Sequence, residues 1–274
     1  MGRLGARMRL QLFSDLHLET EVFDPQPAPG AELLVLAGDI DATWTALDRF
    51  AGWPQPVLMV AGNHEFDGRD LGTAWPALRE RCQRLNIRLL ERERCVLTSA
   101  AGQRVRFVGT VRWSDFELFG PEGRARAMRA AAYFLTLMDA RRDGQAITPD
   151  VMRDESLACR DWLASELRRP NPGPQADDGW HSTVVITHFA PSVRSADPRF
   201  GRQPGTASFC NADDDLLPLA DLWLHGHLHC RHDYTVPRPG KPPTRVVSQA
   251  MGLLRKGEVA GFDPLKLIDL KASV

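Results

Sequence analysis

Histidine, aspartate and asparagine residues follow short apolar runs directly at five places in the chain. Three of these segments, early in the chain, are Asp15-Leu16-His17, Gly38-Asp39 and Gly62-Asn63-His64-Glu65. The other two are His188 and His225-Gly226-His227-Leu228-His229. Side chains of these types bind metal ions or transfer protons. Because the ligand site of an open α/β sheet lies at the carboxyl ends of its strands, we expect the scattered segments to converge.

The candidate ligands form a mixed set of oxygen and nitrogen donors, which suits Mn, Fe, Zn, Co or Ni better than Ca or Mg. Seven candidates are too many for one tetrahedral ion but suit two ions that share a bridging carboxylate. Asp15 and His17 are two positions apart, so they point the same way if the chain stays extended there. The seven residues are Asp15, His17, Asp39, Asn63, His188, His227 and His229.

The five segments, in this order and each after a strand-like run, resemble the calcineurin-like metallophosphoesterase superfamily over residues 15–229. The resemblance implies a role for each candidate. Asp15, His17 and His229 would hold the first metal, and Asn63, His188 and His227 the second. Asp39 would bridge the two ions. His64 would bind no metal and would instead face the substrate phosphoryl group as the catalytic residue.

The resemblance also implies a reaction, the hydrolysis of phosphoric esters with two divalent transition-metal ions. A hydroxide bridging the ions would attack phosphorus, and Mn²⁺ is the ion expected to support activity in vitro. His64 would stabilise the developing charge or protonate the leaving oxygen. The expected substrate is a small phosphodiester or a nucleotide. Several alternatives stay open: a phosphomonoesterase, a pyrophosphohydrolase, a nuclease, a mononuclear metal-binding protein, and a non-catalytic scaffold of the same fold that binds partner proteins.

Short runs rich in Val, Leu and Ile recur along the chain and predict the buried strands of an α/β protein. Helix-like segments lie between several of them, at Ala42–Phe50 and Asp70–Leu85. The resemblance implies the architecture: two packed mixed β-sheets flanked by helices, an αββα sandwich. The predicted strands are Leu10–Phe13, Leu33–Ala37, Val57–Ala61, Val105–Val108, Val184–Thr187, Leu222–Leu224 and Arg245–Val247.

Residues 112–170 carry almost no strand signal and predict a helical insertion within a single domain that spans residues 8–274. One helix is expected over Arg124–Arg142, and a second begins at Thr148-Pro149, with Thr as N-cap and Pro at N1. We expect residues 112–142 to lie over the metal site, with the aromatic side chains of Trp113–Phe116 lining the pocket. The second helix would bury one face, made of Met152, Ser156, Cys159, Leu163 and Leu167.

The 274-residue chain has an ordinary globular composition, with 43% hydrophobic and 25% charged residues. Its net charge of −1 weighs against a nucleic-acid groove or a membrane-binding surface. No stretch approaches the ~18 apolar residues of a membrane span. The five cysteines are odd in number and include no C-x-x-C pair, so we expect no disulfide framework. A chain without disulfides fits a reducing compartment. We therefore expect a cytoplasmic protein whose partner is a small phosphate ester; the oligomeric state is left open.

Three polar features near the candidate ligands are interpreted as structural. His225 precedes Gly226 and is expected to point away from the metals. The acidic run Asp213-Asp214-Asp215 is predicted to form the first turn of a helix, where carboxylates suit the helix dipole. Arg199, in the segment after His188, is interpreted as a surface arginine, with substrate phosphate as its alternative partner.

Overall fold

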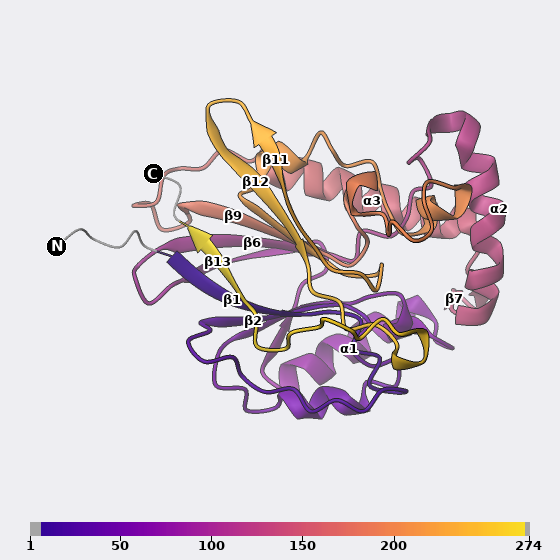
Figure 1. The fold of residues 1–274 in the computed structure, drawn as a ribbon, viewed down its shortest axis with the longest axis horizontal. Coiled ribbons are helices and arrows are strands. Elements are labelled where there is room, and N and C mark those ends of the chain that lie inside the picture. The colour runs from indigo at the N-terminus through magenta and orange to yellow at the C-terminus, as the bar shows by residue number, and fades with distance from the viewer. Residues whose placement is uncertain (1–6, 272–274) are drawn as a thin grey trace.

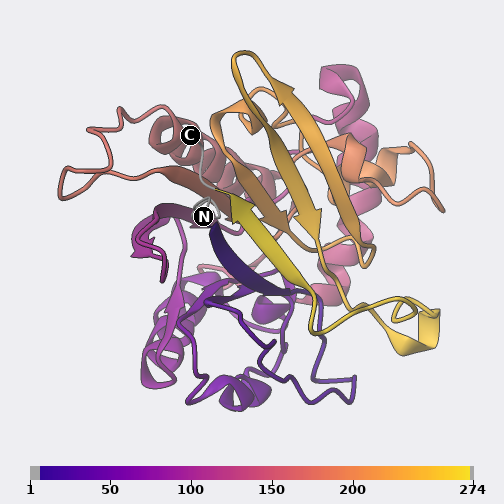
Figure 2. The same cartoon turned by 60° about the vertical axis from the view of Figure 1, so that its left-hand side comes forward.

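The computed structural model describes residues 7–271, which form two mixed sheets flanked by helices (Figures 1 and 2). The helices are α1 (Leu71–Arg84), α2 (Gly120–Met138) and α3 (Pro149–Leu167). The strands are β1 (Arg7–Phe13), β2 (Leu33–Ala37), β3 (Val57–Val60), β4 (Ile87–Leu89), β5 (Glu93–Thr98), β6 (Arg104–Thr110), β7 (Arg141–Arg142), β8 (Gln145–Ala146), β9 (Ser182–Thr187), β10 (Leu222–His225), β11 (His232–Arg238), β12 (Lys241–Ser248) and β13 (Leu267–Lys271).

The central strands of both sheets are parallel, which brings their carboxyl ends to one side. The first sheet has the order β13-β1-β2-β3-β4, and the second has the order β11-β12-β10-β9-β6-β5. The strands β13, β11 and β5 pair antiparallel with their neighbours, so both sheets are mixed. In Figure 1, β1 starts at the left and the sheets extend toward α2 at the right. The residues that follow the parallel strands therefore meet on the α2 side.

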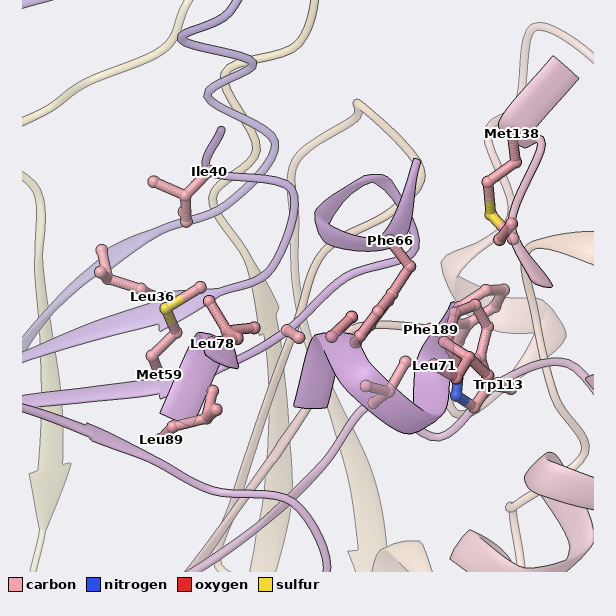
Figure 3. Packing of buried hydrophobic residues seen from close by; sticks show 14 of the residues in the cluster. Leu36, Ile40, Met59, Phe66, Leu71, Leu78, Leu89, Trp113, Met138 and Phe189 are labelled. Atoms are coloured by element: carbon pink, nitrogen blue, oxygen red, sulfur yellow. The ribbon is translucent and has the colours of Figure 1, made fainter. Parts of the chain in front are cut away.

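Three layers of apolar side chains hold the sandwich together. Val184 and Ile186 of β9 lie in the core between the sheets, whereas Val185 packs with Leu163 of α3 on the outer face. On the far side, Leu78 of α1 joins the core of the first sheet (Figure 3). This alternation along a strand is what a sheet covered on both faces requires. The predicted αββα sandwich is confirmed.

The helix predicted after Thr148 is confirmed in detail. The Thr148 hydroxyl accepts a hydrogen bond from the backbone N–H of Val151, and Pro149 occupies the first turn. The five residues predicted for its inner face are its buried residues. The preceding helix, α2, starts at Gly120, earlier than expected, and ends at Met138. Together α2 and α3 connect β6 to its parallel neighbour β9.

Local predictions fail where long-range contacts decide the structure. The segment Ala42–Phe50 forms only a 3₁₀ helix, at Thr45–Phe50. Before this helix the chain forms a turn, in which the carboxylate of Asp41 accepts hydrogen bonds from the backbone N–H groups of Thr43 and Ala46. The strands β4, β5 and β13 went unpredicted because each mixes polar and apolar residues at or near a sheet edge.

The acidic run at Asp213–Asp215 does not begin a helix, so that prediction is wrong. Asp213 is fully buried and pairs with the buried Arg112 at 2.8 Å and with Arg160 at 2.9 Å. A buried carboxylate needs such compensation because removing a charge from water is costly. The long-range ion pairs therefore determine this segment, rather than the helix dipole.

Two further points concern the chain as a whole. Residues 272–274 of the predicted 8–274 domain lie outside the described residues, and the single-domain organisation stays a prediction. Within residues 7–271, no helix is both long and apolar enough to cross a membrane.

Candidate metal centre

The segments that follow the parallel strands converge into two clusters of metal-binding side chains. The first cluster consists of Asp15, His17 and His229, which follow β1 and β10. The second cluster consists of Asp39, His188 and His227, which follow β2, β9 and β10. In each cluster, one potential ligand atom per residue lies within 4.8 Å of those of the others. His227 and His229 are two positions apart, yet they belong to different clusters.

The backbone turns sharply at most of these positions. Asp15 and His17 have φ values of 53° and 45°, so the chain is not extended there and the premise of the predicted alternation is wrong. Asp39, His227 and His229 also have left-handed backbone, with φ values of 53°, 73° and 51°. Such conformations are uncommon for residues other than glycine and gather at functional sites. At these five positions the turn brings the side chain into its cluster.

Carboxylates orient both imidazoles of the first cluster. The Nδ1 atom of His17 lies 3.0 Å from an oxygen of Glu19, and the Nδ1 atom of His229 lies 2.7 Å from an oxygen of Glu258. The two Nε2 atoms face each other at 3.0 Å. With Nδ1 protonated toward a carboxylate, each Nε2 presents its lone pair to a common point, as in metal-bound histidines.

Backbone carbonyls orient the imidazoles of the second cluster. Nδ1 of His188 lies 2.8 Å from the carbonyl oxygen of Ala37, which leaves Nε2 for an ion. Nε2 of His227 lies 3.1 Å from the carbonyl oxygen of Ser208, which leaves Nδ1. The side-chain oxygen of Asn63 lies 3.3 Å from Nε2 of His188, so the structure places this predicted ligand at the second cluster.

Asp39 acts electrostatically on both clusters. Its carboxylate is 1% exposed and lies 3.1 Å from Nε2 of His188. Burial opposes ionisation, but the charge of His188 lowers the pKa of Asp39 well below its ordinary value. Burial also opposes protonation of His17, whereas the hydrogen bond to Glu19 and the charge of Asp39 raise the pKa of that imidazole. The Asp39 carboxylate therefore lies in the second cluster and also acts electrostatically on His17 of the first.

The carboxylate of Glu65, for which the sequence suggested no role, ties two strand ends together. It is fully buried and accepts hydrogen bonds from the backbone N–H groups of Asp39, Ile40 and Gly62 at 2.9, 2.7 and 2.6 Å. A Cβ atom at Gly62 would lie 2.2 Å from the Asp39 carboxylate, so glycine is required at this approach. Glu65 thereby holds Asp39 in place. The one feature of the sequence that could have indicated this role is the place of Glu65 directly after Asn63 and His64.

His64 lies beside the clusters and belongs to neither. Its Nδ1 atom is 2.7 Å from a carboxylate oxygen of Asp67, and its ring centre is 5.2 Å from that of His17. The side chain is 40% exposed, so one edge of the ring is open to solvent. Burial opposes protonation, but the charges of Asp39 and Asp67 raise the pKa of His64 to about 10. These two carboxylates favour the protonated imidazole, which lies next to the first cluster.

Helix α2 joins two segments that border the clusters. The backbone N–H of Gly68, in the turn after His64, donates to the carbonyl of Met138 at the end of α2. The same helix packs against the 3₁₀ segment Pro204–Ser208, whose last carbonyl orients His227. These contacts place α2 next to both segments, and the statement that residues 112–142 lie over the metal site stays a prediction.

The aromatic side chains of Trp113 and Phe116 are buried, so the prediction that they line the pocket over the metal site is wrong. Trp113 packs against Phe66 and Phe189 in the core (Figure 3). Apolar burial outweighs exposure for rings of this size.

His225 is also buried. Its ring bonds to Ser195 and to the carbonyl of Gly226, away from the clusters, as predicted.

The donor set of the two clusters fits two divalent transition-metal ions. Carboxylate and imidazole ligands are present in both clusters, and none of the ligands is a thiolate. Four imidazoles each have one ring nitrogen bonded to a protein oxygen, which leaves the other nitrogen as a ligand. Such sets suit Mn, Fe, Zn, Co or Ni.

Comparisons with solved structures and with family models returned matches, and a comparison with curated proteins returned none. Among solved structures, a phosphopantetheinyl hydrolase from Mycobacterium tuberculosis has a TM-score of 0.69 and 19% identity, with 97% of each chain covered. A 5′-nucleotidase precursor from Thermus thermophilus has a TM-score of 0.45 and 14% identity, with 98% of this chain and 55% of that chain covered. The model of the calcineurin-like phosphoesterase family matches residues 8–231, most of the chain. By that match, this chain belongs to the calcineurin-like phosphoesterase family.

Proposed function

We propose that this protein is a dinuclear metal-dependent hydrolase of small phosphodiesters or nucleotides. Asp15, His17 and His229 hold the first ion in this proposal. Asp39 bridges the two ions, and His64 is the catalytic residue that faces the phosphoryl group. The remaining ligands, Asn63, His188 and His227, hold the second ion.

The observation that supports this proposal best is the juxtaposition of two oriented ligand clusters with Asp39 acting on both. When bound, two divalent ions polarise phosphoryl oxygens and lower the pKa of water. The chain contributes the rest. Glu19 and Glu258 hold the imidazoles of the first cluster in one orientation. His64, held by Asp67 and open to solvent, donates a proton toward the leaving oxygen.

The proposed substrate class depends on what the sequence disfavours. Phosphoprotein phosphatases of this superfamily have an arginine after the Gly-Asp block, and Gly38–Trp44 contains none. A net charge of −1 disfavours a nucleic-acid groove. The fold neighbour is named a phosphopantetheinyl hydrolase, so a phosphopantetheinyl diester belongs among the test substrates; at 19% identity the likeness selects no substrate. Five free cysteines accord with the cytoplasmic location that we also propose.

The test compares hydrolysis of an aryl phosphodiester and the matching monoester by the Mn²⁺-loaded protein, with metal content measured in parallel. We expect faster cleavage of the diester and two metal ions per chain. His64→Ala should slow the reaction with both ions retained. Asp161→Ala, which alters an exposed carboxylate with no contact to the clusters, is the matched control.

The other outcomes of this test select the alternatives. Faster cleavage of the monoester would favour a phosphomonoesterase, and turnover of a pyrophosphate alone would favour a pyrophosphohydrolase. Two bound ions with no turnover of any ester would favour the non-catalytic scaffold. Fewer than two bound ions would contradict the dinuclear site itself.

A further inference from the structure

A cavity of about 340 Å³ lies at the amino ends of the second sheet, on the side away from the metal-binding clusters. It is bordered by Thr183 at the start of β9, by Asp221 just before β10, and by the turn between β11 and β12. Thr183 and His188 are five residues apart along an extended strand, which corresponds to about 16 Å. The cavity is thus separate from the site described above.

The lining of this cavity is strongly basic in a chain whose net charge is −1. Four cations line it, Arg106, Arg169, Arg238 and Lys241, against one carboxylate, Asp221. Arg238 pairs with Asp221 at 2.7 Å, and Arg106 lies 3.4 Å from Glu166. Even when each carboxylate is assigned to one arginine, Arg169 and Lys241 are uncompensated.

These two residues are also free to bind. Within residues 7–271 the side chains of Arg169 and Lys241 are exposed and make no hydrogen bond or ion pair. His181 adds a donor, because its Nδ1 accepts from the backbone N–H of Arg104 and its proton is therefore on Nε2. Unpaired cations and a neutral donor around one cavity match the acceptor oxygens of an oxyanion.

The buried part of the lining is rigid. Arg106 is 2% exposed, donates to the hydroxyl of Thr183 and to the carbonyl of Glu166, and lies over the ring of Trp180 at 4.0 Å. Burial lowers the pKa of this arginine to about 10, and the charges of Arg94 and Arg169 add to the shift, although Glu166 opposes it. A ligand anion would relieve this crowding of positive charge.

We propose that this cavity is a second binding site, for a small molecule that carries a phosphate-like oxyanion. Its volume is at the low end of the range of small-molecule sites, which run from roughly 300 to 1,000 Å³. Arg169 and Lys241 at its rim contact the oxyanion, and Arg106 and Arg238 supply positive potential from beneath. Binding there is independent of metal ions, so it does not depend on the proposed function.

Two measurements on the metal-loaded protein test the proposal. In crystals soaked with tungstate, a phosphate analogue, we expect an anomalous peak within hydrogen-bond distance of Arg169 and Lys241. In solution, equilibrium dialysis with labelled inorganic phosphate should show a site that EDTA does not remove. Its affinity should fall as NaCl is added, since the contacts are ionic.

The double variant Arg169→Ala/Lys241→Ala should weaken this EDTA-resistant site by roughly 10- to 100-fold, because two charge-assisted contacts are lost. The matched control is Arg126→Ala/Arg129→Ala, which removes two exposed cations from α2 and should leave the site unchanged. Equal binding by both double variants, or tungstate at the metal centre alone, would overturn the proposal. A failure of phosphoesterase activity would leave the EDTA-resistant site in place, so the two proposals fail separately.

Discussion

The two ligand clusters use similar metal-binding groups but hold them in different ways. In the first cluster, the imidazoles of His17 and His229 are hydrogen-bonded to the carboxylates of Glu19 and Glu258. In the second cluster, the imidazoles of His188 and His227 are hydrogen-bonded to the backbone carbonyls of Ala37 and Ser208. The charged supports are side chains that a substitution can remove, whereas the neutral supports belong to the main chain.

The groups around each imidazole influence its basicity as a ligand. Burial opposes protonation of His17, yet the hydrogen bond to Glu19 raises its pKa. In the second cluster the carbonyl supports do not set the pKa: burial and the charge of His188 lower that of His227, whereas the charge of Asp39 raises that of His188 to about 9 against the effect of burial. A carboxylate partner makes an imidazole a more basic ligand. We therefore expect the first cluster to depend on its surrounding side chains and the second to depend on the rigid backbone around β2 and the 3₁₀ segment Pro204–Ser208.

The largest effect is expected from removing the carboxylate of Asp39, which acts on both clusters, since this change should disturb the two clusters together. Asp39→Ala should lower kcat by ~10⁴-fold or more, since the ions supply several kcal/mol and each 1.36 kcal/mol is tenfold in rate. Metal content should fall below two ions per chain by elemental analysis. Asp161→Ala should retain both ions and full activity. An active Asp39→Ala protein would contradict the assignment of the bridge.

The residue beside the clusters should separate chemistry from metal binding. His64→Ala should lower kcat by ~10²–10⁴-fold, the usual contribution of a proton-transferring group. Both ions should stay bound, because His64 belongs to neither cluster. Kinetics and metal analysis on the same sample check this prediction. Loss of an ion would show instead that His64 is a ligand.

The supports of the first cluster provide the sharpest test of the comparison. Glu258→Gln keeps an oxygen to accept from His229 and from the backbone N–H of Leu253 but removes the charge. The substitution should lower the affinity for one metal ion by ~10–100-fold and leave the affinity for the other unchanged. Chelator competition measures the two affinities.

Glu19→Gln should lower the affinity for the same metal ion as Glu258→Gln does. The matched control is Glu122→Gln, which changes an exposed glutamate. An equal loss of affinity at both ions would refute the distinction between the clusters.

The smallest effect is expected at the support of the second cluster. Ser208→Ala removes a hydroxyl but leaves the carbonyl that orients His227. Both metal affinities should stay within about twofold of wild type, because the supporting group belongs to the backbone. The same chelator competition measures this change. A loss comparable with that of Glu258→Gln would mean that the second cluster also depends on a side chain.

Much of the architecture could be read locally. The strand Leu33–Ala37 and the buried face of α3 were predicted to the residue, because apolar periodicity and the Thr148-Pro149 start are properties of neighbouring residues. The edge strands β5 and β13 were missed because their polar–apolar patterns do not identify a partner strand. For the site, the sequence supplied the types of the candidate ligands and their positions after strands.

The amino-acid sequence by itself determined which side chains could bind metal, the strands that precede them, and the family they resemble. The resemblance implied that His227 and His229 serve different ions, but only the tertiary structure showed how: left-handed turns at both residues direct their side chains into separate clusters. The tertiary structure also added Glu258 as a support and buried Asp213 against Arg112. These contacts join residues many positions apart in the chain, and no local pattern carries the distance between them.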